Sequence, residues 1–144
     1  MATIDYGNGE QEFRCTARTL TIYEQAFYSD PYPKVTGDLI ADVLGKQRID
    51  EKATGLEWDD DGNLVGITLD FTADNWGAEW RALWAMLRTQ EEIDKKHGVK
   101  RDPVKSFREW DSENAECEPD MRAVSNAVCE ELNRGLFRAG AAAS

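Results

Sequence analysis

The fold is decided by the stretch TADNWGAEWRALWAMLRTQEEIDKKHG, residues 72–98. Its large apolar residues recur at helical spacing: Trp76, Trp80, Leu83, Trp84 and Leu87. This periodicity predicts a helix over residues 74–97, about 36 Å long at 1.5 Å per residue, with Gly98 at the C′ position. An apolar stripe of this width has to be covered by several elements, so we expect this helix at the centre of the fold. The side chains predicted to be buried are Trp80, Leu83, Trp84 and Leu87. The alternative is that one edge of the stripe stays exposed as a partner surface, since tryptophan anchors many interfaces.

Two antiparallel β-hairpins are predicted on the N-terminal side of this helix. Residues 2–15 contain a Gly-Asn-Gly turn at residues 7–9, which is a strong hairpin signal. Residues 56–72 contain the turn DDDGN at residues 59–63, followed by apolar residues that alternate with polar ones. Each hairpin is therefore expected to have one buried and one polar face.

Four further helices are predicted from apolar periodicity and capping residues. In chain order they are a helix capped by Thr16 that ends near Phe27, a short helix in residues 38–45, a short helix with Pro103 at its first position, and a last helix over residues 119–138. The acidic run at residues 111–120 is expected to be a solvated loop. The predicted fold class is α+β: two small hairpins packed with four to five helices in one domain over residues 1–138, with a disordered tail at 139–144.

The net charge of −11 comes from 28 acidic and 17 basic residues. This balance disfavours nucleic-acid binding, which relies on basic residues that contact phosphates. It suits a neutral or basic protein partner, although acidity also serves solubility alone. The three cysteines are widely spaced and form no CxxC pair, which favours a reducing compartment. Without a signal-like segment or an apolar run of ~18 residues, the sequence predicts a soluble cytoplasmic protein with no membrane span.

No catalytic, cofactor or metal site is predicted. The triple aspartate before Gly62 suggests a calcium loop, but EF-hand spacing would place Thr68 where the bidentate glutamate is required. His97, the only histidine, is expected to be a capping or surface residue. Cys129 is expected in the core beside the apolar stripe of the last helix. A triad assembled from residues distant in sequence is the remaining route to an enzyme.

Three segments resemble a known family. They are RTLTIYEQAF at residues 18–27, DLIADVLG at 38–45 and WGAEWRALWAML at 76–87. Together they resemble the tail assembly chaperones of long-tailed bacteriophages and their prophages, over about residues 13–90. The segment SDPYPKVTG at residues 29–37 departs from the family, whose members are shorter there, and the C-terminal third resembles no family.

The resemblance implies a non-enzymatic role in the cytoplasm of the host. Chaperones of this family coat the tape-measure protein, keep it soluble and recruit tail-tube subunits. They are absent from the mature virion, and in several members a ribosomal frameshift adds a C-terminal extension. The alternatives are a structural tail component, such as a tail-completion or tail-terminator protein, and a small enzyme whose site forms only in the fold.

The partner-binding residues expected from this role are aromatic. The tape-measure protein is implied to be long and helix-rich, so it would expose repeated apolar faces to an apolar groove rimmed by charge. Trp110, beside the acidic run, and Tyr28 and Tyr32, in the proline-rich segment, are the anchors expected outside the central helix. Because copies with a net charge of −11 repel one another, we expect weak self-association or none in the free protein, increasing with salt.

Overall fold

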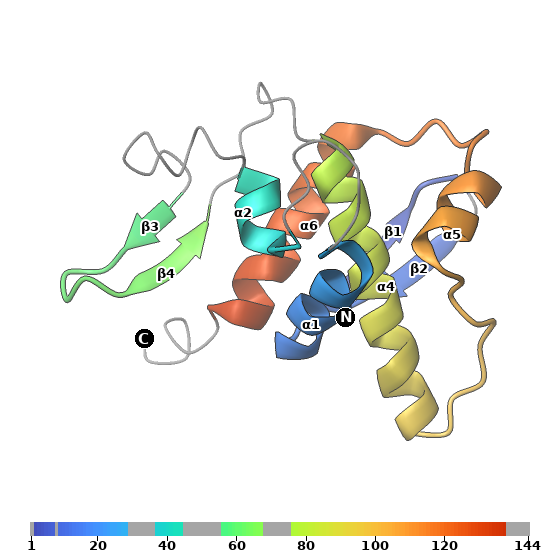
Figure 1. Cartoon of the computed structure of the whole chain (residues 1–144), viewed down its shortest axis with the longest axis horizontal. Helices are drawn as coiled ribbons and strands as arrows, with labels where there is room; N and C mark the ends of the chain where they lie inside the picture. The colour runs from blue at the N-terminus through green and yellow to red at the C-terminus, as the bar shows by residue number, and fades with distance from the viewer. Residues whose placement is uncertain (1, 8, 29–36, 45–55, 68–75, 138–144) are drawn as a thin grey trace.

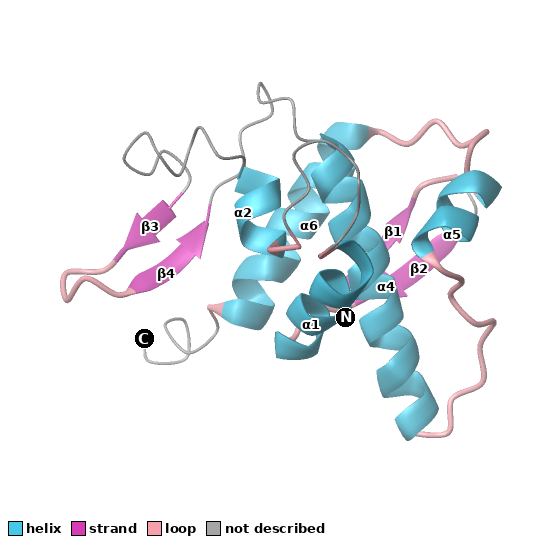
Figure 2. Cartoon of the chain, in the orientation of Figure 1, coloured by secondary structure: helices cyan, strands magenta, loops and turns pink. Residues whose placement is uncertain are grey.

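A computed structural model of the chain describes residues 2–7, 9–28, 37–44, 56–67 and 76–137 (Figure 1). The described part is an α+β fold of five helices and two separate two-stranded antiparallel sheets, as predicted (Figure 2). Its elements are β1 (Ala2–Asp5), β2 (Glu10–Phe13), α1 (Ala17–Phe27), α2 (Leu39–Leu44), β3 (Leu56–Trp58), β4 (Leu64–Ile67), α4 (Trp76–Lys96), α5 (Phe107–Glu113) and α6 (Met121–Leu136). The predicted tail at 139–144 lies outside the described residues.

Helix α4 is the central element, and α1, α2, α6 and β2 all pack against it. Its C-terminal end has the predicted glycine: Gly98 has a φ of +73°, and its N–H donates to the Lys95 carbonyl at 3.2 Å. The Val99 N–H donates to the Asp94 carbonyl at 2.8 Å, which completes a Schellman motif. At the other end, residues 74 and 75 of the predicted helix lie outside the described residues.

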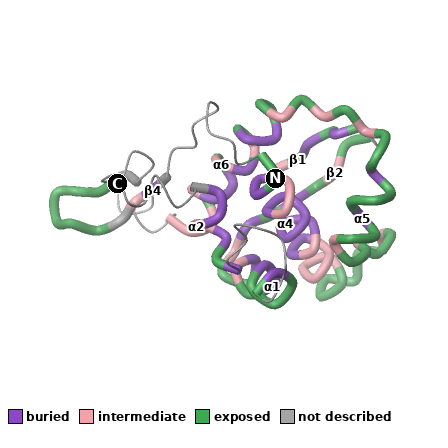
Figure 3. Tube along the Cα trace, turned by 45° about the horizontal axis from the view of Figure 1, so that its top comes forward, coloured by how far each residue is buried: buried purple, intermediate pink, exposed green. Residues whose placement is uncertain are grey.

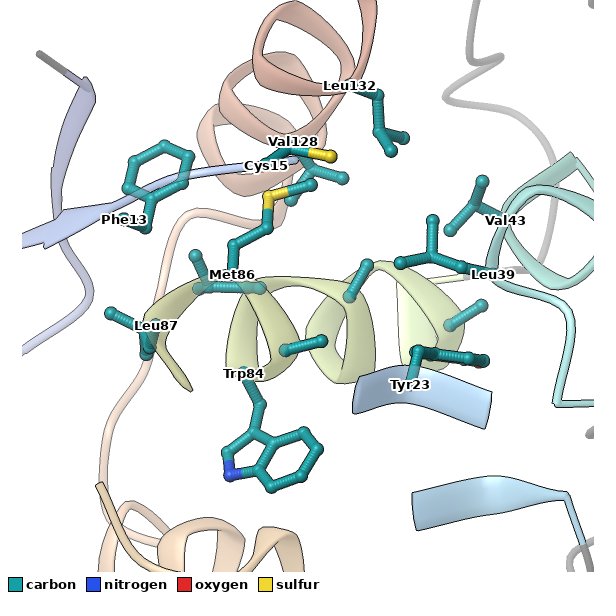
Figure 4. Close-up of a cluster of buried hydrophobic side chains, with 14 of the residues drawn as sticks. Phe13, Cys15, Tyr23, Leu39, Val43, Trp84, Met86, Leu87, Val128 and Leu132 are labelled. Atoms are coloured by element: carbon teal, nitrogen blue, oxygen red, sulfur yellow. The ribbon is translucent and has the colours of Figure 1, made fainter. Parts of the chain in front are cut away.

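The buried face of α4 coincides only in part with the predicted stripe, of which Leu83, Trp84 and Leu87 are buried as expected. Trp84 is buried, but Trp80 is only partly buried and Trp76 is 47% exposed, so the expected burial of Trp80 is wrong in degree. Residues four apart advance by about 40° around a helix, so such a stripe winds off the core face. Besides Trp84, the buried residues of α4 are Ala78, Glu79, Ala82, Leu83, Ala85, Met86, Leu87, Thr89 and Gln90. Figure 4 shows Met86 pointing towards Cys15 and towards Val128 of α6, Leu87 on the side of Phe13 in β2, and Leu39 and Val43 of α2 further along α4.

Helix α1 runs antiparallel to α4. It begins at the predicted Thr16 cap, whose hydroxyl accepts from the Arg18 N–H at 3.2 Å. Near the N-terminal end of α1, the hydroxyls of Thr19 and Thr89 are 2.7 Å apart. One turn further along α1, Tyr23 Oη accepts from Nε of Arg81, which precedes Thr89 in α4, at 3.2 Å. In the last turn of α1, the Phe27 ring centroid lies 5.7 Å from that of Trp84 and 5.8 Å from the Arg81 guanidinium, so this turn packs on the N-terminal half of α4.

Helix α6 fixes the connection between β2 and α1. The Cys15 N–H donates to Glu131 Oε2 at 2.8 Å, and Arg134 Nη2 donates to the Cys15 carbonyl at 3.1 Å. Gly135 allows this approach, because an added Cβ would lie 2.0 Å from the Cys15 carbonyl oxygen. The N-terminal segment is thereby attached directly to the C-terminal helix. Buried residues lie along α4 and α6, whereas the turn between β3 and β4 is exposed (Figure 3).

Two predicted helix starts are wrong. Helix α5 begins at Phe107 with Ser106 as its cap, not at Pro103. Val104 explains the delay, because its N–H donates to Glu91 Oε2 at 2.7 Å and its carbonyl accepts from Arg88 at 3.0 Å. Residues 111–113 of the expected acidic loop therefore belong to α5. The last helix begins at Met121 with Asp120 as its cap, two residues after the predicted Pro119.

Both hairpins form as predicted within the described residues. In the first, Ala2 pairs with Phe13 and Asp5 with Glu10. In the second, Leu56 pairs with Ile67, and β4 contacts α6. This second hairpin projects from the helices, with its turn at the far left of Figure 1. The rest of the second predicted hairpin, residues 68–72, lies outside the described residues.

Candidate partner-binding surfaces

Four large apolar side chains in the described part of the chain are well exposed: Tyr28 at 75%, Val99 at 54%, Trp58 at 53% and Trp76 at 47%. Of the three anchors predicted from the sequence, Tyr28 is among them and Tyr32 lies outside the described residues. Trp110 is only 6% exposed, so in this structure its side chain is not an exposed anchor.

Trp110 is buried because an aromatic cluster surrounds it. Its ring centroid lies 4.6 Å from that of Trp80, 5.7 Å from that of Tyr6 and 6.0 Å from that of Phe107. Its Nε1 donates to Tyr6 Oη at 3.3 Å. Burial also raises the pKa of the Tyr6 hydroxyl, which stays a neutral acceptor. Trp110 therefore joins α5 to α4 and to the residue after β1, which is a structural role.

Tyr28 and Trp76 form what we call the aromatic end. Tyr28 directly follows α1, and Trp76 is the first residue of α4. Because the last turn of α1 packs on the N-terminal half of α4, both exposed rings lie towards that half of α4. Rings that combine a large apolar area with a polar tip are enriched at protein interfaces. The aromatic end is thus an apolar patch that a partner can cover.

A groove lies at the opposite end of the pair, beside the C-terminal end of α4. Its volume is about 730 Å³, within the range of ligand-binding clefts. The lining residues are Arg88, Glu91, Glu92, Lys95, Gly98, Val99, Lys100, Arg101 and Pro103. We call it the basic groove, because four of these side chains are bases and two are acids.

The two acids of the basic groove are already engaged. Glu92 pairs with Arg18 on α1 at 3.0 Å. Glu91 lies 3.8 Å from Arg88 and also accepts the Val104 N–H. Among the bases, Arg101 pairs with Asp94 at 2.9 Å. Lys95 and Lys100 are exposed and make no salt bridge with another described residue, so their charges face the solvent of the groove. Sequence reasoning missed this site, although the run KKHGVKR at residues 95–101 was a signal for it.

The buried polar groups form structural cross-links. Tyr23 Oη donates to Asp42 Oδ2 at 2.8 Å and accepts from Arg81, which joins α1, α2 and α4. Burial raises the pKa of the Tyr23 hydroxyl strongly, so it remains protonated. Burial likewise raises the pKa of the Cys15 thiol to about 12, which leaves it a poor nucleophile at neutral pH. These two groups therefore stabilise the fold rather than supply a reactive centre.

The remaining sequence-based candidates have ordinary positions. His97 is exposed just after α4, as predicted, and Cys129 is partly buried against the core. Asp59 caps its own turn, since Oδ1 accepts the N–H groups of Asp61 and Asn63 at 3.0 and 2.8 Å. Across the residues that the structure describes, no cluster of three or more His, Cys, Asp or Glu side chains is arranged to hold a metal ion.

In the same described ranges, no helix is both long enough and apolar enough to cross a membrane. Comparison of the chain with models of protein families, with curated proteins and with solved structures finds no match. The functional argument therefore depends on the motifs of the chain and on the surfaces described above.

Proposed function

We propose that the chain is a tail assembly chaperone of a long-tailed bacteriophage or prophage. In this role it binds the tape-measure protein and recruits tail-tube subunits in the host cytoplasm, without catalysing a reaction and without remaining in the mature virion. The alternative is a structural tail component, such as a tail-completion or tail-terminator protein.

The observation that supports this proposal is the arrangement of the three segments that resemble the family. They fall on α1, α2 and α4, and each of these helices contacts the other two. Their buried residues share polar cross-links, of which the contacts of Tyr23 with Asp42 and Arg81 are the clearest. The resemblance therefore concerns one packed unit, as expected of a shared domain rather than of unrelated helices with similar composition.

The aromatic end is the surface best suited to the tape-measure protein. A long helix-rich chain exposes apolar side chains at intervals of three and four residues, and exposed aromatic rings can cover them. The net charge of −11 keeps the complex soluble. Tyr32 is retained as a further anchor on the basis of the sequence.

A capture experiment distinguishes the two roles. The tagged chain is purified from phage-infected or prophage-induced cells, and its partners are identified by mass spectrometry. A chaperone recovers the tape-measure protein and is missing from purified virions. Recovery of the chain in finished virions, without capture of the tape-measure protein, would assign it to the structural components instead.

A variant then tests the aromatic end. Tyr28→Ala combined with Trp76→Ala should reduce capture of the tape-measure protein about tenfold or more, because aromatic anchors contribute much of the energy of an interface. The matched control is Gln25→Ala, which truncates an exposed side chain on α1. Equal capture by both variants would show that the aromatic end is not part of the surface that binds the tape-measure protein.

A further inference from the structure

The charge of this protein is strongly segregated. Residues 88–108 contain seven of the 17 bases but only four of the 28 acids, so this stretch has a net charge of +3. The rest of the chain therefore carries −14. The basic groove belongs to this positive stretch, and its Lys95 and Lys100 ammonium groups are exposed without a salt bridge to another described residue. Such a groove attracts anionic groups.

The turn between β3 and β4 has complementary chemistry. Asp59, Asp60 and Asp61 follow one another in it, and all three are exposed. The carboxylate of Asp59 is used to hold the turn, which leaves Asp60 and Asp61 projecting at its tip. Trp58, which is 53% exposed, directly precedes Asp59. We call residues 58–61 the acidic tip: it combines an aromatic ring with adjacent carboxylates.

We propose that the acidic tip of one copy of this chain docks in the basic groove of a second copy. Asp60 and Asp61 face Lys95 and Lys100, and the Trp58 ring packs on Val99, which is 54% exposed at the groove. The volume of the groove, about 730 Å³, admits several side chains of a hairpin tip. This inference does not depend on the proposed chaperone function.

A second copy fits the groove better than other occupants. The tip of the same chain is at the far left of Figure 1, whereas the C-terminal end of α4 is at the lower right, so the contact is intermolecular. A nucleic acid is anionic along its whole length, so the −14 carried elsewhere on the molecule repels all of it, whereas a second copy brings only its acidic tip to the groove. The acidic run at residues 111–120 is a weaker candidate, because Asp111 accepts from Trp80, Glu113 pairs with Lys105 and Asp120 caps α6 within the same chain.

The geometry of this contact allows assemblies larger than a dimer. Tip and groove are different surfaces, so the interface is heterologous, and each copy bound through its groove still offers its own tip. Successive copies then form a ring or a linear array rather than a closed two-fold dimer. Such an array presents the aromatic end of every copy at a regular interval.

Salt should affect this association in two opposite ways. At about 10 mM salt the Debye length is ~30 Å, so the net charges of −11 on the two copies repel each other over a whole protein. At about 0.1 M the Debye length falls to ~10 Å, which screens this repulsion more than it screens charge pairs in contact. At about 1 M, with a Debye length of ~3 Å, the contact pairs are also weakened. Association should therefore peak near 0.1 M, whereas net charge alone predicts a continuous rise with salt.

The first test is sedimentation velocity of the full chain over a concentration series at these three salt levels. We expect oligomers that are most abundant at about 0.1 M and at least several-fold rarer at about 1 M. Association that rises continuously to 1 M would overturn the proposal, as would a protein that stays monomeric at all three levels.

The second test uses two variants that complement each other. Asp60→Asn with Asp61→Asn neutralises the tip, and Lys95→Gln with Lys100→Gln neutralises the groove. Each variant alone should associate about tenfold more weakly than the natural sequence. Mixed, they should form a 1:1 dimer and nothing larger, because only one intact groove and one intact tip remain in each pair. A mixture that stays monomeric would overturn the proposal.

The control variants alter charges outside the contact. Lys96→Gln with Arg108→Gln removes two exposed bases that do not line the groove, and Glu10→Gln with Glu12→Gln removes two exposed acids of β2. Both should assemble like the natural sequence, and weakening equal to that of the tip and groove variants would overturn the proposal. The outcome that favours a different occupant is a monomeric protein whose groove binds a labelled single-stranded DNA oligonucleotide, with binding lost in the Lys95→Gln, Lys100→Gln variant.

Discussion

Replacing Gly135 with alanine should destabilise this protein, although helix propensity predicts the reverse. Gly135 is the penultimate residue of α6, and alanine is favoured over glycine inside a helix by up to about 1 kcal/mol. In the fold, however, the new Cβ would lie 2.0 Å from the Cys15 carbonyl oxygen and 2.7 Å from its carbon. Both obstacles are backbone atoms, so no side-chain rotation relieves the clash.

The loss of stability in Gly135→Ala can be worked out from the separation of α6 and Cys15 that the new Cβ requires. Cβ atoms essentially never approach another heavy atom within 3.0 Å, so α6 and Cys15 must separate by about 1 Å. Overpacking of this kind costs about 1–3 kcal/mol. The separation also weakens the bonds from the Cys15 N–H to Glu131 and from Arg134 to the Cys15 carbonyl. A hydrogen bond to a charged group contributes about 1.5–3 kcal/mol. After the gain in propensity, we expect a net loss of about 2–4 kcal/mol.

Urea denaturation followed by tryptophan fluorescence and circular dichroism measures this loss. The midpoint temperature should also fall, by roughly 6–12 °C for a domain of this size. The control is Gly77→Ala in the first turn of α4, where the added Cβ would meet only Arg81 Nη1, at an ordinary 3.5 Å. It should leave stability unchanged or raise it by up to about 1 kcal/mol. A Gly135→Ala variant as stable as the natural sequence would refute the close packing of α6 on Cys15.

Three further outcomes are expected. Trp84→Ala should cost about 3–5 kcal/mol in urea denaturation, since Trp84 is buried and its Nε1 donates to the Lys105 carbonyl at 2.9 Å; an unchanged midpoint would mean that its side chain is not in the core. The pKa of Cys15 is raised from 9.0 to about 12 in the fold, so the contribution of this thiol to the free energy of unfolding is complete below pH 9. That contribution is lost as the pH rises towards 12. Stability measured over this range should fall less steeply for Cys15→Ala, and identical slopes would contradict the burial of the thiol. Calorimetric titration with calcium and with zinc should show no specific binding at micromolar metal, and a saturating one-site isotherm would disprove this.

The sequence predicted most elements, because their signals are local. The Thr16 cap, the Gly98 helix end and the DDDGN turn depend on residues a few positions apart, and the structure has all three. The start of α5 was missed because it is set by Arg88 and Glu91, which hold Val104 from another element. Proline at a first helical position is a preference, and these tertiary hydrogen bonds override it.

The burial of individual residues was harder to predict. Reasoning from large side chains gave weight to the tryptophans of α4, while the structure buries its alanines, which let neighbouring elements approach closely. Trp110 was judged by its acidic neighbours in sequence, but its surroundings include Tyr6, 104 residues away. The basic groove is not evident from the net charge of the chain, because that sum does not contain the position of its bases on the surface.

The attachment of Cys15 to α6 has a consequence for synthesis of the chain. The two bonds that hold this residue join positions 116 and 119 residues apart in sequence. During translation, the first hairpin and α1 leave the ribosome long before residues 131–135 are made. Chain elongation at about 5–20 residues per second would leave Cys15 and its neighbours without these contacts for roughly 6–24 seconds. Helix α4, once it is made, also lacks the cover of α6 until that last helix emerges, so the nascent chain passes through a period in which it is itself vulnerable to aggregation.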